Sequence, residues 1–269
     1  MERIKRALER AKVERQARQE SRERSSNHQS GGQYQPPSSE NRQTQVIDVS
    51  PDTLDANRIV TLQNDQPISG AYNVLRTQVL QRMQKNGWQT LGVTSANENE
   101  GKTLTAVNLA VSLAREIAKT VLLVEADLRR PSVHKYFGYK PVSGLTDHIV
   151  NGLPLSDVLF SPQIDRLVVL PAGTKYPNTA ELLRSPEMIE LVTELKSRYD
   201  NRLILFDLPP LLAGDDALAF TPYIDCVLLV IEEGKTPPKD VTRSVELLSH
   251  TNFLGSVLNK SKIPQSSYY

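Results

Sequence analysis

Short apolar runs that alternate with helical patterns limit the fold of this chain more than any other feature. From about residue 68 onward, six runs rich in Val, Ile and Leu have the length of strands: 91–94, 120–124, 167–170, 203–206, 227–231 and 257–258. Most are continuous rather than alternating, which is typical of strands covered on both faces. Helical patterns separate them, for example at 104–117, 186–199 and 239–250. This succession predicts an α/β fold with a mostly parallel, doubly wound sheet, right-handed crossovers and helices on both faces.

The composition excludes several classes of protein. The 269 residues include 32 Lys and Arg against 31 Asp and Glu, and the net charge of +1 gives no reason to expect a nucleic-acid partner. The single cysteine, Cys226, cannot form an internal disulfide, and the four histidines show no zinc-ligand spacing with it. No apolar run approaches the roughly 20 residues that cross a bilayer, and the N-terminus has no apolar leader. We therefore expect a cytoplasmic protein without a transmembrane segment of its own.

A P-loop sequence follows the first of these strands. Residues 96–103 fit the pattern GxxxxGK[ST], except that Ala96 replaces the first glycine. The Lys102 ammonium would neutralise phosphate oxygens, the Thr103 hydroxyl would bind Mg²⁺, and backbone N–H groups would face the phosphates. An ordinary strand–helix turn that contains Gly-Lys-Thr is the alternative. The residues predicted to line the nucleotide here are Asn97, Glu98, Asn99, Glu100, Gly101, Lys102, Thr103 and Leu104.

Carboxylates follow two further strands of the predicted sheet. Glu125 and Asp127 come after the run 120–124, and they point the same way if the backbone stays extended. Asp207 ends an apolar strand in a Walker B pattern. Since ligands of parallel sheets bind at the carboxyl ends of the strands, these groups and Thr103 predict a magnesium site in which one carboxylate accepts a hydroxyl proton. A structural ion pair with a neighbouring arginine is the alternative for the first pair.

The order of these three motifs resembles that of the bacterial tyrosine kinases (BY-kinases). These are P-loop proteins related to the MinD/ParA ATPases, and they are associated with capsule and exopolysaccharide synthesis. The likeness covers about residues 71–261, and the charged N-terminal segment resembles the subgroup of exosortase-associated tyrosine autokinases. Segments outside the three motifs share the likeness, among them Arg76-Thr77, residues 130–134, Asp215-Asp216-Ala217 and residues 255–259.

The resemblance implies ATP and Mg²⁺ as cofactors. It assigns catalysis to Lys102, Glu125, Asp127 and Asp207, and the metal to Thr103, Asp127 and Asp207. Glu125 stands where the family usually has aspartate, so its side chain is one methylene longer. Asn259, after the last strand, would lie near the adenine.

The resemblance also implies acceptors and partners. The hydroxyl acceptors would be Tyr268 and Tyr269, at the end of the chain. The activator would be a membrane polysaccharide co-polymerase, a chain-length determinant protein, which would recruit the kinase to the inner face of the cell membrane. Of the family's self-association motif ExxRxxR only Arg76 is kept, since Gly70 and Asn73 occupy the other two positions.

The predicted organisation has four parts. Residues 1–24 carry nine Lys or Arg and five Glu, with Ile4, Leu8 and Ala11 as a thin apolar stripe. That pattern predicts either a solvated helix or one that docks on a partner or an anionic membrane. The parts are a charged amphipathic helix (1–24), a disordered linker (25–67), a P-loop kinase domain (68–263) and a flexible tyrosine tail (264–269).

The sequence thus favours an ATP- and Mg²⁺-dependent protein-tyrosine autokinase that acts in exopolysaccharide biosynthesis. A MinD/ParA-like switch, or a pseudokinase that docks on a co-polymerase without phosphorylating tyrosine, is the alternative. The MinD/ParA ATPases have a signature lysine in the P-loop, and this chain has Asn97 at that position, which weighs against the switch. A nucleotide-free structural relative is the third reading, and the presence of Lys102, Thr103, Asp127 and Asp207 opposes it.

Overall fold

The computed structural model describes residues 44–60, 67–115, 119–198 and 201–262. All of them belong to the larger of two units, which begins at residue 43. The predicted N-terminal helix (1–24) and the acceptors Tyr268 and Tyr269 lie outside the described residues.

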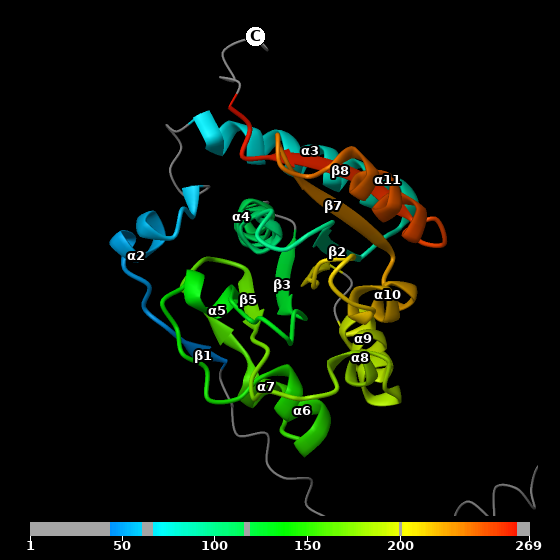
Figure 1. The fold of residues 1–269 in the computed structure, drawn as a ribbon. Coiled ribbons are helices and arrows are strands. Elements are labelled where there is room, and N and C mark those ends of the chain that lie inside the picture. The colour runs from blue at the N-terminus through cyan, green and yellow to red at the C-terminus, as the bar shows by residue number, and fades with distance from the viewer. Residues whose placement is uncertain (1–43, 61–66, 116–118, 199–200, 263–269) are drawn as a thin grey trace, which may run out of the picture. The chain divides into compact units, whose positions relative to one another are not determined.

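One mixed sheet organises the described part of the chain (Figure 1). Its strand order is β1-β4-β5-β3-β6-β2-β7-β8, and every neighbouring pair is parallel except β4 and β5. The predicted mostly parallel, doubly wound sheet is therefore confirmed. The strands are β1 (Gln45–Val46), β2 (Thr90–Ser95), β3 (Thr120–Glu125), β4 (Phe160–Ser161), β5 (Leu167–Leu170), β6 (Arg202–Asp207), β7 (Cys226–Glu232) and β8 (Phe253–Asn259).

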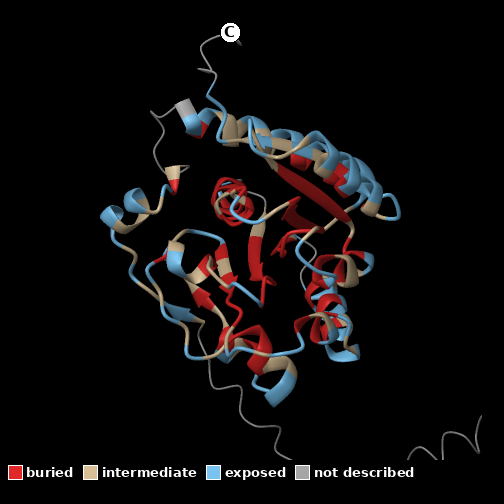
Figure 2. Cartoon of the chain, viewed as in Figure 1, coloured by how far each residue is buried: buried red, intermediate tan, exposed pale blue. Residues whose placement is uncertain are grey.

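The central strands are buried because helices cover both faces. On one face, alternate residues of β2, β3 and β6 pack with the helices at Pro67–Asn86 and Lys102–Ala114 and with Ile59. On the other face, the intervening residues pack with the later helices. Figure 2 shows the buried residues gathered in the strands and in α4 (Lys102–Ala114). The outer sides of three helices are exposed: α2 (Pro51–Ala56), α3 (Pro67–Asn86) and α11 (Pro238–Leu247).

The helices divide between the two faces in chain order. The first face carries α3 (Pro67–Asn86), α4 (Lys102–Ala114) and α5 (Val133–Tyr136). The second carries α6 (Leu145–Asn151), α7 (Leu155–Val158), α8 (Thr179–Leu183), α9 (Pro186–Ser197), α10 (Asp216–Phe220) and α11 (Pro238–Leu247), with a 3-10 turn, η2 (Thr221–Tyr223). Among the described residues, none of these helices combines the length and the apolar character that a membrane crossing requires.

Helix α4 connects the core to the predicted P-loop. It begins at Lys102, directly after Gly101 in a left-handed conformation, and apart from Leu104 its residues are buried. A helix that is apolar on most sides needs cover all round. The sheet supplies it on one side and α3 on the other, so the start of α4 is held firmly at the carboxyl edge of the sheet.

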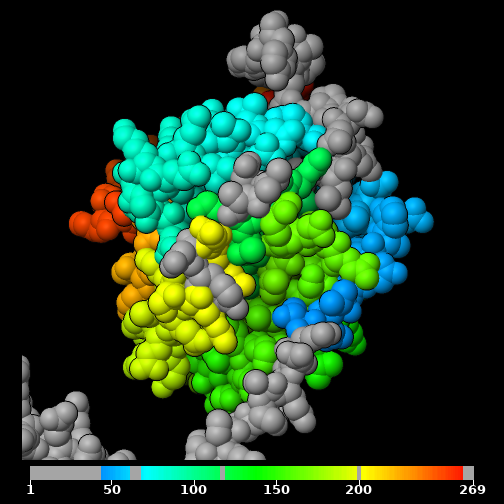
Figure 3. Space-filling model, turned by 180° about the vertical axis from the view of Figure 1, so that it is seen from behind, coloured from blue at the N-terminus to red at the C-terminus, as the bar shows by residue number. Residues whose placement is uncertain are grey.

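The chain before α3 differs from the predicted disordered linker (25–67). Residues 44–60 form an ordered arm in which β1 pairs with β4 and α2 (Pro51–Ala56) begins at a Ser50 cap. Ile59 is 1% exposed in the core. Figure 3 shows this arm, in blue, against the green surface of the sheet's edge. The arm has few of the Ser, Gln, Asn and Gly residues that mark 25–43, and its Ser50 and Pro51 are residue types that begin helices.

Candidate functional site

The predicted P-loop joins β2 to α4 at the carboxyl edge of the sheet. Two of its residues have left-handed backbones, Asn99 with φ +63° and Gly101 with φ +93°. Asparagine tolerates this conformation better than most residues, and glycine takes it freely. A Cβ atom at position 101 would lie 2.1 Å from Asn259 Nδ2, so any other residue there would displace the Asn259 side chain. This loop leads into a helix N-terminus, an arrangement that gathers N–H groups for an anion.

Both glutamates of the loop have partners. Glu100 is buried, and it accepts hydrogen bonds from Asn97 N (3.0 Å) and from Thr236 Oγ1 (2.6 Å). Glu98 pairs with Arg130. The Glu100 carboxylate therefore fixes the shape of the loop, and the charge of Glu98 is neutralised by an arginine rather than left beside the loop.

Four of the predicted site residues meet directly after the loop. Lys102 Nζ lies 2.7 Å from Asp127 Oδ2 and 3.5 Å from Asp207 Oδ1. Thr103 Oγ1 donates to Asp207 Oδ2 at 2.8 Å. Asp207 is fully buried, and the other three are 9% exposed or less. The three motifs, whose residues are up to 105 positions apart in the chain, therefore form one cluster, the Lys102 cluster (Lys102, Thr103, Asp127 and Asp207).

The charges of this cluster are not balanced. Burial raises the pKa of Asp207 to about 6, against the opposing effects of Lys102 and the Thr103 hydroxyl, and Asp127 and Glu125 add to the rise. Burial opposes the charge of Lys102, but Asp207 and Asp127 outweigh that effect and raise its pKa above the usual value. Two buried carboxylates thus share one ammonium, and a further cation would stabilise them.

The oxygen donors fit a magnesium ion that is bound together with phosphates. A threonine hydroxyl and one or two carboxylates are typical Mg²⁺ partners when a nucleotide supplies the rest. Within the described ranges, no group of three or more His, Cys, Asp or Glu side chains is arranged to hold a metal. The donor set therefore suits a metal held between protein and nucleotide, not a metal held by the protein alone.

Glu125 lies next to the cluster but bonds elsewhere. It pairs in register with Asp207 in the sheet, and it is fully buried. Its oxygens accept from Val133 N (2.5 Å) and Ala172 N (2.9 Å) and approach His134 Nδ1 at 3.1 Å. Glu125 thus ties the end of β3 to the start of α5 and to the loop after β5. The predicted catalytic role stays untested, and these bonds favour a positioning role instead.

On the other side of the P-loop, the ends of β7 and β8 hold its backbone. Asn259 Nδ2 donates to Glu100 O at 2.9 Å. Lys260 Nζ donates to Asn99 O at 2.7 Å and to Glu232 Oε2 at 2.8 Å. Asn259 was predicted near this site, whereas Lys260 was missed. It directly follows a parallel strand that ends at the same edge, and that rule would have found it.

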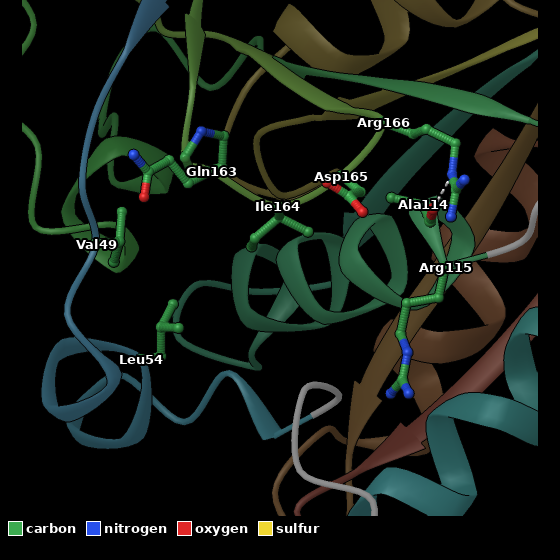
Figure 4. A pocket seen from close by; sticks show the side chains of 9 residues that line it. Val49, Leu54, Ala114, Arg115, Gln163, Ile164, Asp165 and Arg166 are labelled. Carbon is green, nitrogen blue, oxygen red and sulfur yellow. Dashed lines mark hydrogen bonds between the residues drawn. The ribbon is translucent and has the colours of Figure 1, made fainter.

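A hollow lies at the amino edge of the sheet, opposite the P-loop, and Figure 4 shows its lining. Its volume is about 470 Å³, and Val49 and Leu54 of the arm face Ile164 across it. Arg166 donates to Ala114 O at 3.0 Å, at the end of α4. Because these residues lie at the far end of α4 from Lys102, the hollow is not part of the candidate site.

Fold and cluster together define a P-loop protein of the α/β class, and comparisons with known proteins place it further. No protein-family model matches the chain. The chain is 36% identical to tyrosine-protein kinase YwqD of Bacillus subtilis over 203 residues, and this match covers 75% of this chain and 84% of that protein. It is 32% identical over 200 residues to tyrosine-protein kinase CpsD of Streptococcus pneumoniae, a match that covers 73% of this chain and 86% of that protein. The chain belongs to the family of bacterial tyrosine-protein kinases.

Solved structures agree with this assignment. The kinase domain of Escherichia coli tyrosine kinase ETK superposes with a TM-score of 0.72 at 27% identity, covering 84% of this chain and 92% of that one. The chimerical protein CapA2B2 gives a TM-score of 0.71 at 28% identity, with 81% and 94% covered. MinD of Pyrococcus horikoshii, complexed with Mg-ADP, has a TM-score of 0.53 at 24% identity, over 65% and 72%, and shares the fold.

Proposed function

We propose that this chain is an ATP- and Mg²⁺-dependent kinase that phosphorylates tyrosine, first of all its own Tyr268 and Tyr269. The observation that carries the proposal is the convergence of Lys102, Thr103, Asp127 and Asp207 at the end of the P-loop. Membership of a family whose relatives are named tyrosine-protein kinases supports it.

The mechanism follows from what each side chain can do. Phosphoryl transfer depends mainly on positioning and on neutralising charge. Lys102, once a nucleotide takes the place of its carboxylate partners, would pair with phosphate oxygens. Thr103, Asp207 and Asp127 would hold Mg²⁺, which when bound neutralises charge on the phosphates.

The acceptor proton needs a base within reach of the phenol. Asp127 is better placed for this than Glu125, since the Glu125 oxygens already accept two backbone N–H groups. Asp127 Oδ2 pairs with Lys102, and Oδ1 accepts only from Arg130 N at 3.1 Å, which leaves a lone pair of Oδ1 for a phenol. As the phenol oxygen bonds to the γ-phosphorus, the bond to the ADP oxygen breaks and the phenol proton passes to Asp127.

The biological setting comes from the family resemblance. We propose that the kinase acts in exopolysaccharide biosynthesis, that a membrane polysaccharide co-polymerase activates it, and that it works at the inner face of the cell membrane. The kinase domain would include the ordered arm as well as residues 68–263, because Ile59 is part of its core. Self-association would then bring the tail of one copy to the site of another.

A MinD/ParA-like switch without tyrosine phosphorylation is less well supported. The named relatives above 30% identity are kinases, while the MinD likeness at 24% identity concerns the fold. The Lys102 cluster also brings together the lysine, hydroxyl and carboxylates on which the proposed phosphoryl transfer relies, which supports the kinase.

The test is to map phosphotyrosine by mass spectrometry after incubation with ATP and Mg²⁺. The activator should be present, and matched samples should contain EDTA or the Lys102→Ala variant. Phosphate on Tyr268 or Tyr269 in the complete reaction alone is the expected result. Unmodified tyrosines in every sample would reject the kinase and favour the switch.

A further inference from the structure

A second pocket opens beside the Lys102 cluster, on the side of β3. Its volume is about 390 Å³, and its lining includes Arg58, Leu104, Ser132, Lys135 and Tyr136. Leu104 follows Thr103 on α4, and α5 follows β3, whereas Asn259 ends β8 on the far side of β2. The P-loop therefore separates this pocket from the position predicted for the adenine. A group that entered here would approach the start of α4 at Lys102 and Thr103, where the phosphates are predicted to bind.

The arm that precedes the core builds one wall of this pocket. The Asn108 side chain, fully buried on α4, donates to Arg58 O at 3.0 Å and accepts from Val60 N at 3.0 Å. Asn57 Nδ2 donates to Tyr136 O, also at 3.0 Å. Arg58 itself has a left-handed backbone, with φ +58°. The buried Asn108 amide, which also donates to Leu104 O at 3.1 Å, thus holds Arg58 at the mouth of the pocket.

The mouth of the pocket is positively charged. Arg58 and Lys135 are both exposed there, and no acidic residue belongs to the lining. Tyr136 also lines the pocket. Burial raises the pKa of its phenol, Asp207 adds to the rise, and Lys102 and Arg58 oppose it. The phenol is thus within electrostatic reach of the cluster on one side and of Arg58 on the other.

We propose that this pocket admits the acceptor tyrosine, and that Arg58 and Lys135 select protein segments with acidic residues beside that tyrosine. This inference rests on the proposed kinase function. A pocket of about 390 Å³ has room for one phenol ring, and two exposed cations at its mouth complement an acidic flank. The chain's own last ten residues contain two lysines and no acidic residue, so this selection concerns substrates other than Tyr268 and Tyr269.

The test compares two tyrosine peptides that differ only in their flanks, glutamate in one and glutamine in the other. Transfer from ATP gives KM for each, and versions with Phe in place of the tyrosine give the affinity by fluorescence anisotropy without any transfer. We expect the acidic peptide to bind about threefold to tenfold more tightly, as for one or two exposed charge pairs. Arg58→Glu and Lys135→Glu should each remove the preference.

Lys85→Glu is the matched control, since it makes the same charge change on an exposed residue at the end of α3. It should keep the preference. Equal affinity of the wild type for both Phe peptides, or a preference that survives in Arg58→Glu and Lys135→Glu, would overturn the proposal. A loss in Arg58→Glu that is confined to ATP affinity would also overturn it, since Arg58 would then bind the nucleotide rather than the peptide. A preference in binding without transfer to any tyrosine would instead reject the kinase and leave the pocket's selectivity standing.

Discussion

The two sides of the P-loop are built differently. On the side of β3 and β6, which we call the acidic flank, Lys102 and Thr103 meet the buried carboxylates of Asp127 and Asp207. On the side of β7 and β8, the clamp flank, the groups of Thr236, Asn259 and Lys260 hold the loop by hydrogen bonds to Glu100 and Asn99.

The physical consequence is a division of work. The acidic flank concentrates charge in a place where burial makes charge costly, and it raises the pKa of Asp207. Burying two carboxylates beside one ammonium costs stability, and carboxyl groups perturbed in this way are typical of sites for charged ligands. The clamp flank is half-exposed at Lys260 and makes ordinary hydrogen bonds, which keep the loop in one shape. Chemistry should therefore be sensitive to the acidic flank and affinity to the clamp flank.

The largest effect is expected at Lys102. Lys102→Ala removes the cation that pairs with both carboxylates and that would neutralise the phosphates. Tyrosine phosphorylation should fall by roughly a hundredfold to a thousandfold, as when a key electrostatic group is removed from an active site. Incorporation of phosphate from ATP measures it, and circular dichroism checks that the variant is folded. A folded variant with near-wild-type activity would contradict the P-loop assignment.

Asp207 gives a prediction about pH. In the folded, metal-free protein its pKa is raised from 3.8 to about 6. The stabilising effect of the neutral carboxyl is fully present below about pH 4 and is lost as the pH rises through about 6. The free energy of unfolding of the wild type, relative to Asp207→Asn, should therefore fall by up to about 3 kcal/mol across this window.

Urea unfolding in EDTA between pH 4 and pH 7 measures the free energy of unfolding of both proteins. A change of about 2 kcal/mol in the difference between them can be resolved. Mg²⁺ with nucleotide at pH 7 should restore stability to the wild type more than to Asp207→Asn, since only the wild type keeps the carboxylate. A difference between the two proteins that does not vary with pH would show that Asp207 ionises normally.

Much of the fold could be predicted because buried parallel strands leave a plain pattern. The continuous runs at 167–170 and 227–231 match β5 and β7 within one residue. The edge strand β8 was predicted only at 257–258, since Gly255 and Ser256 interrupt its apolar pattern and the edge needs less burial. The strands β1 and β4 have two residues each, too few for any periodicity.

The site divides in the same way. Lys102, Thr103, Asp127 and Asp207 could be placed together because a motif and the rule for strand ends locate them. Glu125 was predicted at the carboxyl end of its strand, where the structure has it in register with Asp207, but the sequence gives no sign that it would bond to Val133 and Ala172. Such partners depend on how separate loops meet, and neither spacing nor propensity contains that information.

Glu125→Gln distinguishes chemistry from positioning. Glutamine has one carbonyl oxygen, whereas Val133 N and Ala172 N donate to different oxygens of Glu125. One buried N–H would lose its acceptor, and the free energy of unfolding should fall by about 1–3 kcal/mol. Activity at a temperature where the variant is folded should fall far less than in Lys102→Ala. An unchanged stability with a hundredfold loss of activity would move Glu125 into the catalytic group.

The smallest effect is expected on the clamp flank. Lys260→Met removes the bond to Asn99 O and keeps most of the side chain's volume. The KM for ATP should rise about twofold to fivefold with kcat unchanged, since a half-exposed ammonium contributes less than about 1 kcal/mol. Lys235→Met is the control, because Lys235 also pairs with Glu232, at 3.5 Å.

A further substitution, Asn99→Gly, tests why Lys260→Met should raise the KM for ATP. Glycine adopts the left-handed conformation of residue 99, φ +63°, without support, so the loop should no longer depend on Lys260. In the Asn99→Gly background, Lys260→Met should therefore leave the KM for ATP unchanged, which a double-mutant cycle measures as a coupling between the two positions. If the two effects are simply additive, Lys260 contacts the nucleotide itself, and the clamp flank then contributes charge to the site in the same manner as the acidic flank.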